Sequence, residues 1–182
     1  ATALGKLSQP ATTSKVLDAF QKLLVDTNEN EYVRGSIANA LGNLGKVAAT
    51  PEVLDMLVEL LTAQNWSMCA SIANALGNLG EAAATPKVLD TLVGLLVHER
   101  SDVRHYAVVA IGNLGETVAT PEVLDMLQGL LADKEQNVRS SAAEALGKLG
   151  KLVATPKVLD MLLRLVTDEN DAVSQSAVLA FG

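Results

Sequence analysis

Cys69, His98 and His105 carry the thiol and the two imidazoles of the chain, the groups that could act as soft metal ligands or as a nucleophile and its base. A cysteine that opens a helix can have a lowered thiol pKa, but the chain offers Cys69 no dedicated His and acid partner. His98 and His105 are seven residues apart with no third ligand near them, which argues against a metal site. We therefore predict no catalytic residue and no metal, and we expect Cys69 to be buried or half-buried.

Glycines and carboxylates recur along the chain, but their patterns do not favour catalysis. The Gly-x-x-Gly segments, such as residues 42–45, lie at predicted helix ends rather than after a strand, so they do not form a phosphate-binding turn. The carboxylates are expected on solvated outward faces, where nothing perturbs their pKa or pairs them for acid–base work. The sequence therefore predicts neither an enzyme nor a bound cofactor.

The composition excludes further classes of protein. Fourteen Lys and Arg residues against twenty-one Asp and Glu residues give a net charge of −7, which argues against nucleic-acid binding because phosphate contacts need clustered cations. No apolar run approaches the roughly 20 residues that span a bilayer, so no membrane partner is expected. The single cysteine cannot form an internal disulfide and is typical of a reducing compartment, which favours a cytoplasmic location.

Two signatures repeat along the chain with a period of 35 residues. Thr-Pro-x-Val-Leu-Asp begins at Thr50, Thr85, Thr120 and Thr155, and a copy without the proline occupies residues 13–18. Ala-Leu-Gly-Asn-Leu-Gly occupies residues 40–45 and 75–80, with close variants at 110–115 and 145–150. We predict one domain over residues 1–182, made of a partial second helix at 1–8 and five repeats at about 13–49, 50–84, 85–119, 120–154 and 155–182.

Each repeat is predicted to be a pair of antiparallel helices. In the second repeat the first helix covers about Pro51–Thr62, with Thr50 as N-cap and proline at the first helical position. The second helix covers about Met68–Leu79 and ends at Gly80, a suitable left-handed C-cap. Neither helix can bury its apolar stripe alone, so neighbouring pairs must stack. The pattern predicts an all-α, right-handed α-solenoid with first helices convex and second helices concave.

The repeat resembles the HEAT family, in particular its short bacterial and archaeal type, which includes arrays attached to signalling NTPases and phycobilin lyases. The residues that carry the resemblance are clearest in the fourth repeat, at Leu130-Leu131, Asp133, Val138-Arg139 and Ala145-Leu146-Gly147. The tetratricopeptide family is the rival, with a period of 34 residues. That family places proline after its second helix and requires aromatic residues at fixed positions, and neither feature is present here.

The resemblance implies that the Asp after each first helix pairs with the Arg opening a second helix, in a ladder between repeats. The corresponding positions hold Asp26 and Arg34, Ala63 and Cys69, His98 and Arg104, Asp133 and Arg139, and Asp168 and Ser174. The second repeat has lost both partners and carries Trp66, Met68 and Cys69 instead. Two interpretations stay open: Trp66 covers the corner between the helices, or it is an exposed anchor at the rim of a binding surface.

The concave face of the second helices is the predicted binding surface. The helical period places on or beside it a set of candidate partner-binding residues: Asn39, Asn43, Asn74, Asn78, His105, Tyr106, Val109 and Asn113. Asparagines four residues apart can pair with an extended peptide backbone, but they can equally solvate a helix end. Tyr106 is either a packing residue or a recognition residue. Glu52, Glu59 and Gln128 are expected on the opposite, convex face.

We expect a cytoplasmic scaffold or sensor segment of a larger chain that binds a protein or peptide. One alternative is a HEAT-like subunit of a phycobilin-lyase-type enzyme, which would need a cleft with perturbed acids. A second is a nucleic-acid-binding HEAT protein, which is disfavoured because Lys148 and His105 alone are cationic candidates on the predicted face. A third is a designed consensus array. Terminal repeats without polar caps also favour end-to-end self-association.

Overall fold

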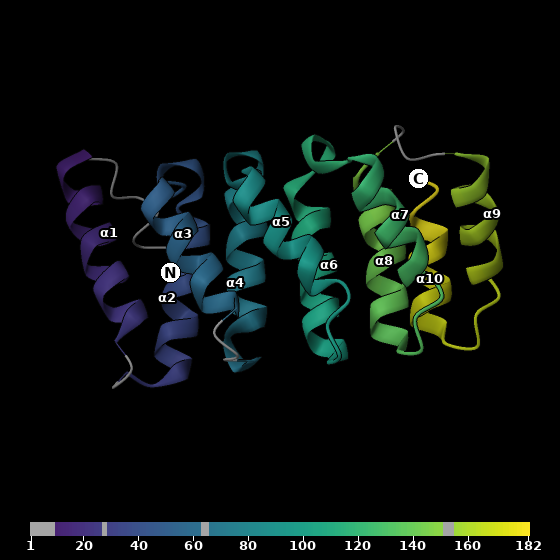
Figure 1. The fold of residues 1–182 in the computed structure, drawn as a ribbon, viewed down its shortest axis with the longest axis horizontal. Coiled ribbons are helices and arrows are strands. Elements are labelled where there is room, and N and C mark those ends of the chain that lie inside the picture. The colour runs from purple at the N-terminus through teal and green to yellow at the C-terminus, as the bar shows by residue number, and fades with distance from the viewer. Residues whose placement is uncertain (1–9, 27–28, 63–65, 151–154) are drawn as a thin grey trace. The chain divides into compact units, whose positions relative to one another are not determined.

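The structure is a computed structural model that describes residues 10–26, 29–62, 66–150 and 155–182, with the backbone alone at 10–13, 62, 66 and 67. Every regular element in these ranges is helical, and no β-strand occurs among them (Figure 1). The α-helices are α1 (Pro10–Val25), α2 (Glu31–Asn43), α3 (Pro51–Thr62), α4 (Trp66–Leu79), α5 (Pro86–Leu95), α6 (Ser101–Leu114), α7 (Pro121–Leu130), α8 (Gln136–Lys148), α9 (Pro156–Leu165) and α10 (Asp171–Leu179). No helix in the described ranges is both long and apolar enough to cross a lipid bilayer.

The chain divides inside α5 into two compact units, one ending at Val88 and the other beginning at Leu89. In the first unit α1 packs on α2, α3 packs on α4, and the second helices α2 and α4 pack on each other. In the second unit α7 packs on α8, α9 packs on α10, and α8 lies between α6 and α10. Both units therefore stack helix pairs through their second helices, as the repeat pattern predicts.

The threonine and glycine of the repeat signatures begin and end these helices. The Thr120 Oγ1 accepts a hydrogen bond from the backbone N–H of Val123 at 3.3 Å, and Thr155 does the same for Val158 at 3.3 Å. A proline follows at the first helical position, where its missing N–H has no cost. After the second helices, the predicted C-cap Gly80 has a φ of +63°, which confirms its left-handed conformation.

The helix boundaries of the second repeat agree closely with the sequence prediction. Helix α3 spans the predicted residues, whereas α4 begins at Trp66, two residues before the predicted start. The difference arises because apolar periodicity marks the buried part of a helix and not its first hydrogen-bonded turn. The Cys69 side chain is 1% exposed, which confirms that it is buried.

Successive second helices approach each other closely at a glycine of the Ala-Leu-Gly signature. A Cβ atom added to Gly42 would lie 2.7 Å from the Cα of Ala75 on α4. Added to Gly112, it would lie 2.9 Å from the Cα of Ala145 on α8. Added to Gly147, it would lie 2.9 Å from the Cα of Ala180, just after α10. The glycine therefore recurs because a larger side chain does not fit between the stacked helices.

Gln128 departs from the sequence prediction. It is expected on the solvated convex face of the first helices, but it is 7% exposed, and its Oε1 atom is buried without a hydrogen-bond partner among the residues that the structure describes. The equivalent positions of the other repeats hold Val58, Val93 and Leu163. Gln128 thus occupies a position that is apolar in the other repeats. The sequence-based expectation of exposure is wrong because it rests on the polarity of glutamine.

Replacing Gln128 with leucine should raise the free energy of unfolding by about 1–2 kcal/mol, because a buried acceptor without a partner carries the full cost of its desolvation. Gln128→Glu serves as the control and should lower stability, since it places a charge at the same buried position. Urea denaturation of the three proteins measures both effects. A leucine variant that is less stable than the parent protein would contradict the assignment.

Candidate functional site

An ion-pair ladder links consecutive repeats in the second unit. The Arg104 guanidinium donates from Nη2 to Asp133 Oδ1 at 2.8 Å and from Nε to Asp133 Oδ2 at 2.9 Å. Arg139 repeats this bidentate geometry with Asp168, at 2.9 and 3.0 Å. In both pairs the arginine opens one repeat's second helix and the aspartate belongs to the next repeat. The pairing between repeats that the family resemblance implies is confirmed here.

The ladder corrects the expectation that the carboxylates are solvated and unperturbed. The side chains of Asp133 and Asp168 are 9% and 10% exposed. Hydrogen bonds from Arg139 lower the pKa of Asp168 against the opposing effect of burial. Burial raises the pKa of Asp133, but the hydrogen bonds from Arg104 and the Glu135 N–H outweigh it, so that this pKa is also lowered. The arginine partners therefore favour the ionised form of both carboxylates.

The ladder has a different form in the first unit, because Ala63 stands where the fourth repeat has Asp133. Arg34 remains at the start of α2, is 7% exposed, and donates from Nε to the Leu24 carbonyl oxygen at 2.7 Å. In the described part of the chain it forms no ion pair with a carboxylate. Its hydrogen bond stays within its own repeat and does not reach the next one.

Four candidate binding residues lie on the packed helices α2 and α4 of the first unit. Asn43, Asn74 and Asn78 are exposed. Asn39 is half-buried, and its Nδ2 donates to the Ser71 Oγ at 3.4 Å. The structure therefore presents three of the four predicted amides to solvent and directs the fourth across the junction of the two helices.

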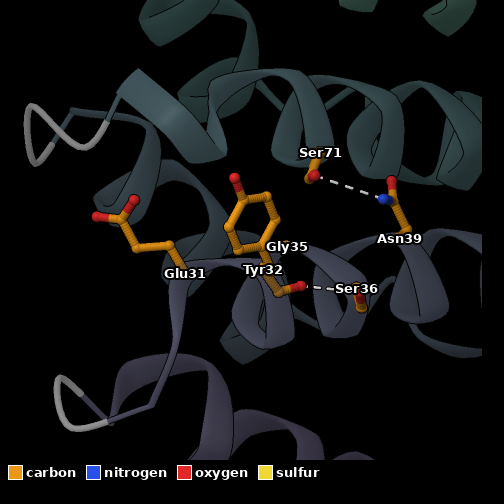
Figure 2. A pocket seen from close by; sticks show the side chains of 6 residues that line it. All are labelled: Glu31, Tyr32, Gly35, Ser36, Asn39 and Ser71. Carbon is orange, nitrogen blue, oxygen red and sulfur yellow. Dashed lines mark hydrogen bonds between the residues drawn. The ribbon is translucent and has the colours of Figure 1, made fainter.

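A groove of about 420 Å³ runs along the junction of α2 and α4. Its lining consists of Glu31, Tyr32, Gly35, Ser36, Asn39 and Ser71 (Figure 2). The Tyr32 side chain is 87% exposed, and Figure 2 shows its ring rising from α2 toward α4. Sequence reasoning missed Tyr32 as a site residue. The available signal was that the matching position in other repeats holds small or polar residues such as Asp102 and Asn137.

The remaining candidates lie on α6 in the second unit and are half-buried. The His105 Nδ1 lies 2.6 Å from the Ser141 Oγ and 3.2 Å from the Asn137 carbonyl oxygen, both on α8. The Tyr106 ring meets the His105 ring edge-on at 4.7 Å between centroids. Tyr106 therefore contacts the ring of its neighbour in sequence, and its role in recognition stays a prediction.

Val109 and Asn113 also face α8. Val109 lines a small hollow together with Gly112, Ser141, Glu144, Ala145 and Lys148. The Lys148 Nζ donates to the Asn113 Oδ1 at 2.8 Å and pairs with Glu144 at 2.7 Å. In the second unit, the candidate binding residues His105, Tyr106 and Asn113 thus already contact other side chains of the chain. The side chain of Trp66, the predicted rim anchor, lies outside the described residues.

The His105–Ser141 contact does not have the geometry of a catalytic dyad. The Ser141 hydroxyl donates to the Asn137 carbonyl oxygen at 2.7 Å, so its proton is not directed at the imidazole. The His105 Nδ1 atom also lies 3.2 Å from the Asn137 carbonyl oxygen, an environment that suits an N–H donor, whereas a general base would have to accept there. Among the described residues, no three His, Cys, Asp or Glu side chains are grouped to hold a metal ion. The arrangement is that of a hydrogen-bonded helix junction.

Comparison with known proteins identifies the repeat. The family described as HEAT repeats matches residues 1–73, 44–111 and 89–182. No protein with a curated description matches the sequence. An engineered protein of solved structure is 23% identical, with a TM-score of 0.68 over 90% of this chain and 77% of its own.

Two further solved structures carry a ligand or partner. A designed armadillo repeat protein in complex with the peptide (KR)4 is 23% identical, with a TM-score of 0.62 over 96% of this chain and 86% of its own. The complex of CpcE and CpcF of phycocyanin lyase from Nostoc sp. PCC7120 is 22% identical, with a TM-score of 0.62 over 96% of this chain and 100% of the matched chain. At these identities the likeness shows the shared fold.

Asp133→Asn should lower the free energy of unfolding by about 1–3 kcal/mol at pH 7, because it removes a charge-assisted bidentate pair. Because the pKa of Asp133 is lowered in the folded state, the pair contributes its full stability above the ordinary carboxyl pKa of 3.8. This contribution is lost as the pH falls through the folded-state pKa. The penalty should therefore be constant from pH 7 to about 5 and shrink below about 4.

Urea denaturation across this pH range measures the penalty, with the exposed Asp125→Asn on α7 as the matched control. A penalty that persists unchanged below pH 4 would show that the pair is not the source of the effect.

Proposed function

The chain belongs to the family of HEAT repeats, all-α solenoids of stacked helix pairs, and from that premise we propose that it is a non-enzymatic scaffold that binds a protein or peptide along its second helices. The observation that carries the proposal is the open polar surface of α2 and α4. There Asn43, Asn74 and Asn78 are exposed, and a groove lies beside them. Each amide offers two donors and an acceptor, which matches the alternating groups of an extended peptide backbone.

Charge and the comparisons support a basic peptide as the partner. The chain has a net charge of −7, and a protein of the same fold is in complex with the peptide (KR)4. Electrostatic complementarity of this kind favours encounter and selects against acidic partners. It equally disfavours nucleic acid, as does the pairing of Lys148 with Glu144 and Asn113. A phycobilin-lyase-type activity has weaker support, because no second observation such as the charge of the chain accompanies the likeness in fold to the lyase complex.

The second group of candidates, on α6, is the less open part of the proposed site. His105, Tyr106 and Asn113 already contact side chains of their own unit, so a partner would have to displace or extend those contacts. We retain them, with Val109, as secondary contacts and Trp66 as a rim anchor. The buried thiol of Cys69 fits a reducing compartment, and we place the scaffold in the cytoplasm.

The test is the binding of an octapeptide of alternating Lys and Arg, measured by titration calorimetry at low salt. Asn74→Ala combined with Asn78→Ala should weaken binding by about 5–30-fold, the effect of losing two interface hydrogen bonds. Both side chains are exposed, so the melting temperature should not change. Replacing His105 is a poorer test, because its hydrogen bond to Ser141 also contributes to stability.

The matched control is Glu52→Ala on α3, a first helix. If the asparagine pair has no effect while Glu52→Ala abolishes binding, the partner uses the convex face and the proposed site is wrong. If the octapeptide does not bind the parent protein, the choice of a basic peptide is wrong.

A second candidate activity is self-association through the end of the second unit. Four apolar side chains are exposed on and beside α9 and α10: Leu163 at 59%, Val178 at 53%, Leu179 at 69% and Phe181 at 45%. An apolar face of this kind favours association with another copy of the chain. Leu163→Glu combined with Leu179→Glu should shift the protein toward monomer in sedimentation velocity over a concentration series. Val97→Glu, at an exposed valine of the α5–α6 connection, is the control, and equal behaviour of the two variants would contradict the proposal.

A further inference from the structure

The groove between α2 and α4 occupies the place that a side chain fills in the other unit. Two repeats further along the sequence, His105 stands at the position of Gly35, and Ser141 stands at the position of Ser71. The His105 imidazole lies across the α6–α8 junction, with its Nδ1 atom 2.6 Å from the Ser141 Oγ. Gly35 has no side chain to do this, and the α2–α4 junction is left as an open groove. The chain itself therefore shows what kind of group fits there, namely a planar group with an N–H donor.

The groove is lined by hydrogen-bond acceptors. The Asn39 Nδ2 donates to Ser71, so its carbonyl oxygen is left as an acceptor, and the Ser71 Oγ retains a lone pair. The Ser36 hydroxyl gives its proton to the Tyr32 carbonyl oxygen at 2.8 Å, and Glu31 adds a carboxylate at the margin. None of the six described residues that line the groove is a cation. Such a lining complements a positively charged donor.

Tyr32 decides between the two cationic side chains of proteins. Its ring is 87% exposed and stands at the groove, between Glu31 and the Asn39–Ser71 hydrogen bond (Figure 2). An exposed ring face stacks well on a guanidinium, which is planar and carries five N–H donors without an acceptor. An ammonium group is compact and strongly hydrated, and it presents no flat face to the ring.

We propose that the groove between α2 and α4 binds an arginine side chain of the partner. The guanidinium stacks on Tyr32, donates to the Ser71 Oγ, which is equivalent to the Ser141 Oγ that His105 contacts, and lies near the carboxylate of Glu31. This inference rests on the proposed function, since the arginine belongs to the peptide or protein that the scaffold binds. It adds a side-chain subsite to a surface otherwise proposed to contact peptide backbone.

The experiment is a nuclear magnetic resonance titration of the ¹⁵N-labelled full chain with the capped pentapeptide Gly-Ser-Arg-Ser-Gly. We expect shifts at the amides of Gly35 and Ser71 and at the side-chain amide of Asn39. The same peptide with citrulline, which keeps the shape but removes the charge, should bind at least about fivefold more weakly. The lysine peptide should bind about two- to fivefold more weakly, because it loses the stacking.

Two variants test the subsite from the protein side. Tyr32→Ala should weaken binding of the arginine peptide by about two- to fivefold. Tyr32→Phe should retain binding because the ring is kept. Gly35→His should place an imidazole in the groove, as His105 does at the α6–α8 junction. It should therefore abolish the chemical-shift changes that the arginine peptide causes. Because a Cβ on Gly35 would lie 2.9 Å from the Ser71 Oγ, its folding is checked by circular dichroism, and the exposed Tyr32 variants carry the test if it fails. Val97→Ala, at an exposed apolar side chain of the α5–α6 connection, is the control and should leave binding unchanged.

The outcomes separate this inference from the proposed function. Equal binding of the arginine and citrulline peptides, or shifts that Tyr32→Ala does not reduce, would overturn the arginine subsite. If the octapeptide then still depends on Asn74 and Asn78, the scaffold function stands without it. The opposite result is also informative. If octapeptide binding does not depend on Asn74 and Asn78 while the arginine peptide still shifts the Gly35 amide signal, the arginine subsite stands. The proposed contact of these asparagines with the peptide backbone is then wrong.

Discussion

The close approach of successive second helices is the constraint on which the rest of the structure depends. At Gly42 a Cβ atom would come within 2.7 Å of the next helix, and Gly112 and Gly147 are restricted to the same degree. Side chains one and two helical turns before each glycine lie on the same stripe and must therefore cross the junction. This is why Asn39 meets Ser71 and His105 meets Ser141. The close helix contact that requires a glycine therefore also places Asn39 and His105 at the junction between second helices.

How much the sequence could predict depends on whether the deciding contact is local. Caps such as Thr120 and Gly80 act within four residues, so the helix pairs and their ends follow from the repeat alone. The burial of Gln128 and the groove beside Tyr32 depend on how helices distant in the sequence pack, which single-repeat patterns do not specify. Asp133 is an intermediate case. Its partner Arg104 is 29 residues away, and it was implied by the family resemblance although its burial was not.

The two units place different side chains on the same scaffold. Across the α6–α8 junction, His105 reaches Ser141 at 2.6 Å and Lys148 reaches Asn113 at 2.8 Å. At the equivalent places of the α2–α4 junction the sequence has Gly35 and Asn78. The signature residues cannot account for this difference, because they are shared. Functional specificity in this chain is therefore to be sought where the repeats differ, and repeat consensus alone cannot reveal it.

The groove and the interrupted ladder occur in the same unit. Among side chains that the structure describes, α2 and α4 are joined across their groove by the 3.4 Å contact between Asn39 and Ser71. Arg34 bonds within its own repeat, whereas Arg104 forms a bidentate pair with the next. A ligand that binds this junction in the folded state alone adds contacts the chain does not supply itself, and mass action converts its binding into stability. The α2–α4 groove is thus a suitable place for a scaffold to bind its partner. The partner would supply contacts there that His105 supplies at the α6–α8 junction.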